Sequence, residues 1–360
     1  MVIPSIEQIK RFLSGIDRSF LMLNILIFSA FVAPLLIIYC FVPYGDISFN
    51  ALWKGRAPYF LFIWLLFLEA ILGWKKLKTE RPTGWTKKRV LTAVIMILPT
   101  LYAVGLSFGL HAGIVKLGEA VGVPIINGDT WYLTHSWPFS FEYILFTAFF
   151  ITSIWLLYGF RGLKSFSVSS VFIGGVGLFY MIDTFYPNGT FTALQFLVPI
   201  TTSGVVVILN FLGYNTQTFP AGDTGLQLTV TGASGEPYSA VIAWSCAGSH
   251  SLFLYSFMIM LFLRGTSISR MRKVIYVVVG AAGTFFVNIL RIVAIYVIGI
   301  NGGGSPAKLF HEFYGEFFFI AWMFIYLSLV FISETWLIGK ISSLRRPKQP
   351  PTKPTQPELP

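Results

Sequence analysis

The feature that most constrains this chain is the recurrence of long apolar runs along nearly its whole length. About 20 apolar residues in a row cross a bilayer as a helix. Only 11% of the 360 residues are charged, whereas a soluble domain carries about 25%. The chain is therefore predicted to be an all-α polytopic membrane protein, which excludes a soluble enzyme, a disordered chain and a coiled coil. Eight stretches are expected to form transmembrane helices: 19–43, 58–74, 90–111, 141–160, 168–186, 243–263, 274–298 and 313–338.

The distribution of Lys and Arg predicts the orientation, because cytoplasmic loops carry an excess of basic residues. With the amino terminus inside and eight crossings, 21 of the 26 basic residues fall on the inner side. A ninth apolar stretch, 191–212, would move the basic residues of 264–273 and of the tail outside if it also crossed. We therefore expect 191–212 to be re-entrant or to lie on the outer surface, with both termini cytoplasmic in a plasma-membrane protein. The net charge of +11 then reflects topology, and no nucleic-acid partner is expected.

The outer segment before the sixth span has a pattern of its own. Residues 227–231 alternate polar and apolar side chains, residues 232–235 are typical of a turn, and a second run begins at Tyr238. This pattern predicts a small extracytoplasmic β-hairpin at 226–243 that leads directly into the next span. The chain is thus expected to have four parts: transmembrane helices in 1–187, an outer helix and hairpin in 188–242, further transmembrane helices in 243–340, and a disordered proline-rich cytoplasmic tail in 341–360.

Three reactive or charged side chains are predicted to reach one depth near the outer face. Cys246 and Arg291 each lie 18 residues from the basic residue that marks the inner end of their span, which is about 27 Å of helix. His311 opens the last span directly after an outer loop. Polar groups at membrane depth are costly, so they commonly mark a functional site. A thiol, a guanidinium and an imidazole from three consecutive spans are therefore expected to meet.

These three groups have separable chemical roles. A thiol attacks as its thiolate, a form that a neighbouring cation favours, and an imidazole can take up and deliver protons. A guanidinium keeps its charge and can hold a carbonyl oxygen or an oxyanion. Each of the three residues, taken alone, has an ordinary structural explanation. A lone membrane cysteine, for example, usually packs as a small apolar residue, and this is the role expected of Cys40. Together, Cys246, Arg291 and His311 predict acyl transfer through a thioester, without a metal or organic cofactor.

Four neighbouring residues are candidates for supporting or substrate-binding roles. His250 lies one helical turn deeper than the thiol and competes with His311 as the base. Asn288 shares a helix face with Arg291. Glu312 either orients His311 or caps the last helix. The supporting set is Ser245, His250, Asn288 and Glu312.

Two motifs in this region resemble those of one known family. The run from Ala243 to Leu252, Ala-Trp-Ser-Cys-Ala-Gly-Ser-His-Ser-Leu, resembles the cysteine motif of the exosortase/archaeosortase family. Residues 288–292, Asn-Ile-Leu-Arg-Ile, are similar to that family's Asn-x-x-Arg-Ile motif, and His311 falls where its third active-site residue is expected. The resemblance covers about 190–320, and alanine after the cysteine favours the archaeosortase side.

The resemblance implies an activity and a class of partner. Such enzymes are intramembrane cysteine transpeptidases that act on secreted proteins with a carboxyl-terminal signal, made of a short motif, a hydrophobic helix and a basic cluster. They cleave just before the helix and pass the new carboxyl end to an acceptor, thought to be a membrane lipid in the archaeal branch. On this resemblance Cys246 attacks the peptide, Arg291 steadies the thiolate or oxyanion, and His311 handles protons.

Two other functions remain open from the residues alone. In a transporter or channel, Arg291, His311 and Glu312 would line an outer vestibule, although transporter sites tend to lie near the bilayer midplane. In a non-enzymatic scaffold for secreted proteins, the hairpin would be the contact surface. A transporter should tolerate replacement of Cys246, whereas a peptidase should not.

Overall fold

The computed structural model describes residues 18–50, 55–73, 77, 87–187, 190–222, 225–232, 235–264, 266 and 268–345. The predicted tail beyond Arg345 and most of the basic loop at 75–89 lie outside the described residues. Contacts divide the described chain into two compact units. The first contains residues up to Pro199 with 218–227 and 241–244, and the second contains 200–217, 228–240 and the chain from Ser245 onward. Each unit is a separate body with its own core.

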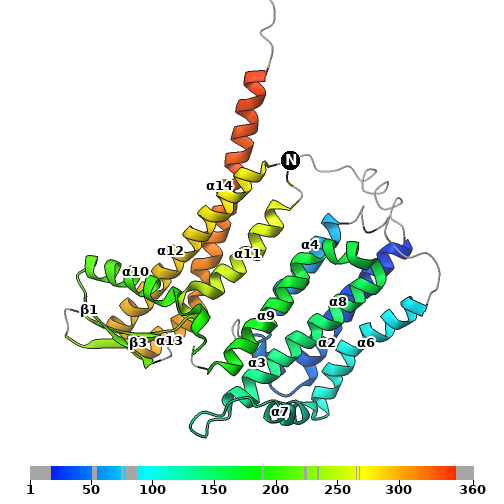
Figure 1. The fold of residues 1–360 in the computed structure, drawn as a ribbon, viewed down its shortest axis with the longest axis horizontal. Coiled ribbons are helices and arrows are strands. Elements are labelled where there is room, and N and C mark those ends of the chain that lie inside the picture. The colour runs from blue at the N-terminus through cyan, green and yellow to red at the C-terminus, as the bar shows by residue number, and fades with distance from the viewer. Residues whose placement is uncertain are drawn as a thin grey trace, which may run out of the picture. The chain divides into compact units, whose positions relative to one another are not determined.

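The first unit is a helical bundle. Within it α8 packs against α6 and α9, α6 packs against α2, and α4 packs against α9, as Figure 1 shows. Its elements, in which η marks a short π-helical or 3-10 turn, are α2 (Arg18–Phe41), α3 (Gly45–Ser48), α4 (Pro58–Leu72), α6 (Lys87–Ser107), α7 (Leu110–Ala120), η1 (Tyr132–Ser136), α8 (Trp137–Ser165), α9 (Ser167–Phe185) and η3 (Thr192–Leu194).

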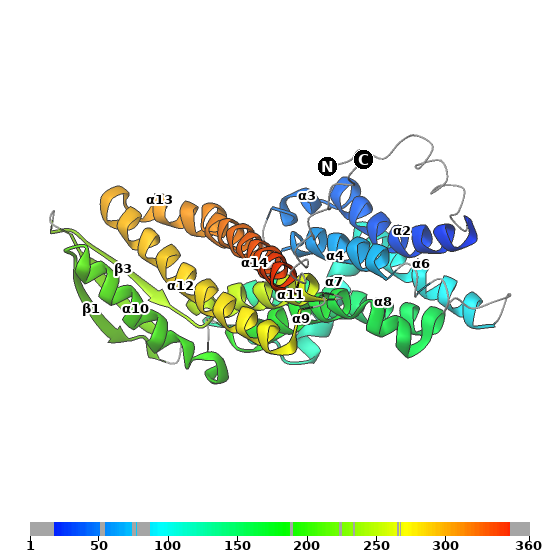
Figure 2. The ribbon, with the colours of Figure 1, turned by 90° about the horizontal axis from the view of Figure 1, so that it is seen from above.

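The second unit contains most of α10, parts of a small sheet, and the helices of the carboxyl-terminal half. Helix α12 packs against both α11 and α14, and α13 follows α12 at the turn toward α14, an arrangement visible in Figure 2. The elements are α10 (Leu197–Phe211), β1 (Asn215–Pro220), β2 (Leu226–Thr231), β3 (Pro237–Ile242), η5 (Ser245–Ser249), α11 (His250–Leu263), α12 (Arg270–Gly302), α13 (Gly304–Leu309), η6 (Phe310–Tyr314) and α14 (Glu316–Arg345).

Helix length and composition confirm the prediction of an all-α polytopic membrane protein. Seven of the described helical segments are long and apolar enough to cross a membrane. The second predicted span, 58–74, corresponds to α4, a helix of only 15 residues. At 1.5 Å per residue such a helix is about 22 Å long, shorter than the hydrocarbon core of about 30 Å. Helix α10 also has 15 residues, and its expected failure to cross remains a prediction.

The predicted hairpin is present as two strands of a three-stranded sheet. Strands β2 and β3 match it, and the sheet order is β1-β2-β3. The hydroxyls of Thr229 and Ser239 lie 2.9 Å apart across the hairpin. The first strand, β1, was not expected from the sequence, because its residues Asn-Thr-Gln-Thr carry almost no apolar alternation. All but one of its residues are exposed.

A buried ion pair lies inside the first unit. Arg56 donates from Nε and Nη2 to the two carboxylate oxygens of Glu142, at 2.8 and 2.6 Å, and Tyr102 donates to the same carboxylate at 3.2 Å. Glu142 is fully buried. The sequence gives no signal for this pair, because the two residues lie 86 positions apart. Such a pair costs desolvation and is tolerated when its hydrogen bonds are satisfied, as they are here.

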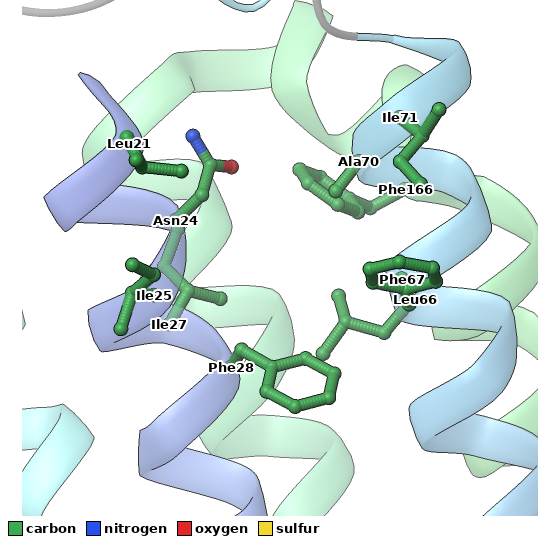
Figure 3. Close-up of a pocket in the computed structure, with 10 residues that line it drawn as sticks. All are labelled: Leu21, Asn24, Ile25, Ile27, Phe28, Leu66, Phe67, Ala70, Ile71 and Phe166. Carbon is green, nitrogen blue, oxygen red and sulfur yellow. The ribbon is translucent and has the colours of Figure 1, made fainter. Parts of the chain in front are cut away.

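An apolar groove lies between α2 and α4 in the first unit, with a volume of about 240 Å³. Figure 3 shows the side chains of the two helices facing each other across it, and Asn24 is its one polar lining residue. Walls of this composition suit the hydrocarbon chains of a bilayer. The lining residues are Leu21, Asn24, Ile25, Ile27, Phe28, Leu66, Phe67, Ala70, Ile71 and Phe166.

Candidate active site

Cys246 lies in η5, a π-helical turn placed between β3 and α11. The turn contains Gly248 in a left-handed conformation, with φ 105°, which glycine adopts without steric cost. A β-carbon at Gly248 would lie 3.2 Å from the Phe285 ring and 3.3 Å from the Asn288 amide. The short run Cys-Ala-Gly-Ser therefore lets the turn fold tightly against α12. Turns of this type are frequent at functional sites.

His311 places its imidazole within hydrogen-bond reach of the thiol. The Cys246 Sγ and His311 Nε2 atoms lie 3.6 Å apart in partly buried surroundings. His311 is carried by a second π-helical turn, η6, just before α14. As the sequence predicted, Cys246 lies at the start of a segment, Ser245–Leu263, that is long and apolar enough to cross a membrane. His311 lies in the turn that precedes the last helix. A thiol and an imidazole at this distance can exchange a proton.

Arg291 contacts the turn that carries His311. Its Nη2 donates to the main-chain oxygen of His311 at 3.3 Å. Its guanidinium also packs closely on Gly315, where any β-carbon would overlap Arg291 Nε. The arginine is half-buried, and its fixed charge lies beside the backbone of the imidazole-bearing turn.

Asn288 makes the corresponding contact with the other turn. Its Nδ2 donates to the main-chain oxygen of Cys246 at 2.9 Å, and the side chain is only 3% exposed. Asn288 and Arg291 are three residues apart on α12, so they lie on one face of the helix. One helix face therefore binds both the thiol-bearing turn η5 and the imidazole-bearing turn η6.

A further contact to η5 was not anticipated from the sequence. Thr201 of α10 donates from Oγ1 to the main-chain oxygen of Ala247 at 2.8 Å. Both residues are fully buried. The sequence offers one signal, the polar pair Thr201 and Thr202 inside the otherwise apolar stretch 191–212.

The other predicted supporting residues occupy the same two turns or border them. Ser245 is the first residue of η5 and His250 is the first residue of α11. His250 is half-buried. Glu312 lies in η6, and its side chain is outside the described part of the structure.

Tyrosines connect strand β3 to α12 near this site. Tyr296 donates from its hydroxyl to the main-chain oxygen of Ala240 at 3.0 Å, and its ring meets that of Tyr238 edge-on at 5.5 Å. Desolvation by partial burial raises the pKa of the Tyr238 hydroxyl. The end of β3 that precedes Cys246 is thereby held to the helix that bears Asn288 and Arg291.

Both cysteines of the chain, Cys40 and Cys246, are free thiols. Cys40 is exposed on α2 in the first unit. Among the described residues, no three His, Cys, Asp or Glu side chains lie close enough together to share a metal ion.

The comparisons with known proteins identify one family. The family model described as transmembrane exosortase matches residues 52–328. That range includes all seven predicted site residues and extends far upstream of the motifs at 243–252 and 288–292. No curated protein and no solved structure matches the chain.

Proposed function

Because the chain belongs to the transmembrane exosortase family, we propose that it is a cysteine transpeptidase that processes the carboxyl-terminal sorting signals of secreted proteins. The observation that carries this proposal is the 3.6 Å distance between Cys246 Sγ and His311 Nε2. The family supports a membrane sorting enzyme in general. The nucleophile, the base, the signal and the acceptor are our assignments.

In the first half-reaction Cys246 is the nucleophile. His311 takes the thiol proton, and the thiolate attacks the carbonyl carbon of the scissile peptide bond to form a carbon–sulfur bond. The carbon–nitrogen bond then breaks as His311 returns the proton to the leaving amine. The products are a thioester on Cys246 and the released helix with its new amino end.

In the second half-reaction an acceptor replaces the enzyme. A hydroxyl or amine of a membrane lipid gives its proton to His311 and attacks the thioester carbonyl. The carbon–sulfur bond breaks, the thiolate leaves, and the secreted protein is joined to the lipid. His311 then returns its proton to the sulfur, which restores the starting state.

Arg291 is assigned to orientation and charge. Its hydrogen bond to the His311 carbonyl fixes the turn that carries the base, and its permanent positive charge favours the negative forms of the cycle, the thiolate and the tetrahedral oxyanion. Asn288 fixes the turn of the nucleophile in the same way.

The site is assigned to the outer end of its helices. A substrate whose signal helix is anchored in the bilayer would present the peptide just before that helix at this depth. The excess of basic residues in the predicted inner loops supports an outward-facing site.

The test of the nucleophile is a processing assay on a secreted protein of the same organism that carries a terminal motif, helix and basic cluster. Cells with the unaltered enzyme should convert the precursor to a shorter, membrane-held form, and cells with Cys246→Ala should accumulate precursor. Cys40→Ala is the matched control, since it removes the other free thiol and should leave conversion unchanged. Equal processing with Cys246→Ala and the unaltered enzyme would overturn the proposal.

The two histidines provide the test of the base. His311→Ala should lower the rate of processing by about 10²–10⁴-fold, the usual contribution of a positioned acid–base group. His250→Ala should retain most of the rate, because His311 already places an imidazole 3.6 Å from the thiol. The reverse ranking, measured as initial rates on the same substrate, would assign the proton transfer to His250.

A further inference from the structure

We propose that Thr201 is a positioning residue for the Cys246 nucleophile, so that α10 is part of the catalytic apparatus. The inference rests on the proposed function of Cys246. It follows from the side-chain hydrogen bonds to two successive main-chain oxygens, those of Cys246 and Ala247.

The oxygens of Cys246 and Ala247 both accept hydrogen bonds from side chains of other helices. Asn288 of α12 donates to the first at 2.9 Å, and Thr201 of α10 donates to the second at 2.8 Å. Each of these two peptide oxygens has a side-chain donor from a helix outside the turn. The two side chains therefore fix the orientation of consecutive peptide groups, one of which bears the thiol.

Helix α10 can reach this position because it approaches α12 closely. Gly204, three residues after Thr201 and on the same helix face, lies under the side chain of Ile289, whose Cδ1 would be 2.7 Å from a β-carbon at Gly204. Ile289 directly follows Asn288. Helices α10 and α12 therefore approach closely at the same place where Thr201 and Asn288 bind the turn η5.

The adjacent residue, Thr202, is a matched control position for Thr201. Thr202 is 2% exposed and Thr201 is fully buried, so both hydroxyls are removed from solvent. Within the described structure the Thr202 hydroxyl has no hydrogen-bond partner, whereas the Thr201 hydroxyl binds the oxygen next to the nucleophile. The same substitution at the two positions separates the effect of the hydrogen bond from the effect of altering a buried threonine.

Loss of the Thr201 hydroxyl would remove this side-chain donor from the buried Ala247 oxygen. The turn would then relax toward other partners and shift Cys246 relative to His311. A misplacement of about 1 Å at a reacting group costs about 10²-fold in rate. Thr201 itself is buried and binds main chain, so the expected effect falls on kcat and not on KM.

The experiment uses the full-length enzyme in lipid nanodiscs, with Cys40→Ala throughout so that Cys246 is the only thiol. Two properties are measured for three variants, Thr201→Val, Thr201→Ser and Thr202→Val. The first is the rate of processing of a peptide that carries its signal helix, and the second is the rate of Cys246 alkylation by iodoacetamide as a function of pH. Thr201→Val should lower kcat by about 10–10²-fold, leave KM unchanged and shift the alkylation profile. Thr201→Ser should restore both, and Thr202→Val should match the parent.

Equal kcat and equal alkylation profiles for Thr201→Val and Thr202→Val would overturn the inference. Cys246→Ala is the separate test of the proposed function, which is wrong if that variant still processes substrate. In that case the alkylation profiles alone decide whether Thr201 positions the thiol. If Thr201→Val does not fold, the pair Thr201→Ser and Thr201→Ala, which differ only in the hydroxyl, takes its place.

Discussion

At the scale of single residues, the structure gives Arg291 a geometric contact in addition to its charge. The sequence predicted that Arg291 steadies the thiolate or oxyanion. In the structure its guanidinium donates to the His311 main chain and packs on Gly315. A planar guanidinium can make both contacts at once, whereas an ammonium group is a single, strongly hydrated point charge.

Arg291→Lys keeps the charge and removes this geometry, and it should therefore be impaired. Hydrogen bonds from charged groups contribute about 1.5–3 kcal/mol, so processing should slow by about 10–10²-fold. Initial rates of processing by the purified variant provide the measurement, with Arg291→Gln showing the additional loss of charge. Full activity of Arg291→Lys would mean that charge alone is needed.

Cys246, Arg291 and His311 could be brought together from the sequence because Cys246 and Arg291 lie equally far from the inner end of their spans and His311 follows an outer loop. The bonds from Arg291 and Asn288 could not be predicted, because each ends on a main-chain oxygen. Thr201 illustrates the limit, since nothing in residues 197–211 reveals that one hydroxyl meets a peptide group 46 positions away.

At the scale of elements, long apolar runs predicted most helices, but their ends were set by contacts elsewhere in the chain. Helix α8 has a break at Gly159, with φ 64° and ψ −163°, near the predicted end of that span at residue 160. The turns η5 and η6 were not expected, because a π-helical turn has no sequence pattern distinct from the helix that follows it. Strand β1 was missed because it is polar and exposed.

The start of α9 depends on a carboxylate from α4. Glu69 accepts from the main-chain N–H groups of Val168 and Ser169 at 3.1 and 2.8 Å and from the Ser169 hydroxyl at 2.7 Å. The side chain is 1% exposed. A negative charge at a helix amino terminus is favourable, and these first N–H groups have no partner within the helix.

Glu69→Ala should therefore destabilise the first unit by about 2–4 kcal/mol, since it leaves buried donors without an acceptor. Glu69→Gln keeps one acceptor oxygen and should lose less. Thermal unfolding of the protein in detergent provides the measurement, and the exposed Glu119 of α7 is the matched control for Glu→Ala. Equal unfolding temperatures for Glu69→Ala and Glu119→Ala would contradict this role of Glu69.

At the scale of the whole molecule, the chain is a multi-pass membrane protein of the exosortase family. Its predicted orientation rests on the distribution of basic residues and not on the helices themselves. Helix α10 decides the topology, because an additional crossing would reverse the side on which every later loop lies.

A reporter enzyme that is active only outside the cell tests this directly. Fused after Gly222, in the connection between β1 and β2, it should be active, because α10 is predicted not to cross. Fused after Arg264, at the end of α11, it should be inactive and serves as the internal control. Activity after Arg264 without activity after Gly222 would invert the proposed topology and place the cysteine turn on the cytoplasmic side.

The three-residue spacing of Asn288 and Arg291 has a consequence for how genes of this type can change. Inserting or deleting one codon between them would rotate one side chain by about 100° around α12, so a single helix face could no longer hold both turns. A length change in the loop before α12 would leave the pair intact. Among chains that retain the cysteine and the histidine, an altered spacing at this point would therefore identify copies that have lost this active-site architecture while still inserting in the membrane.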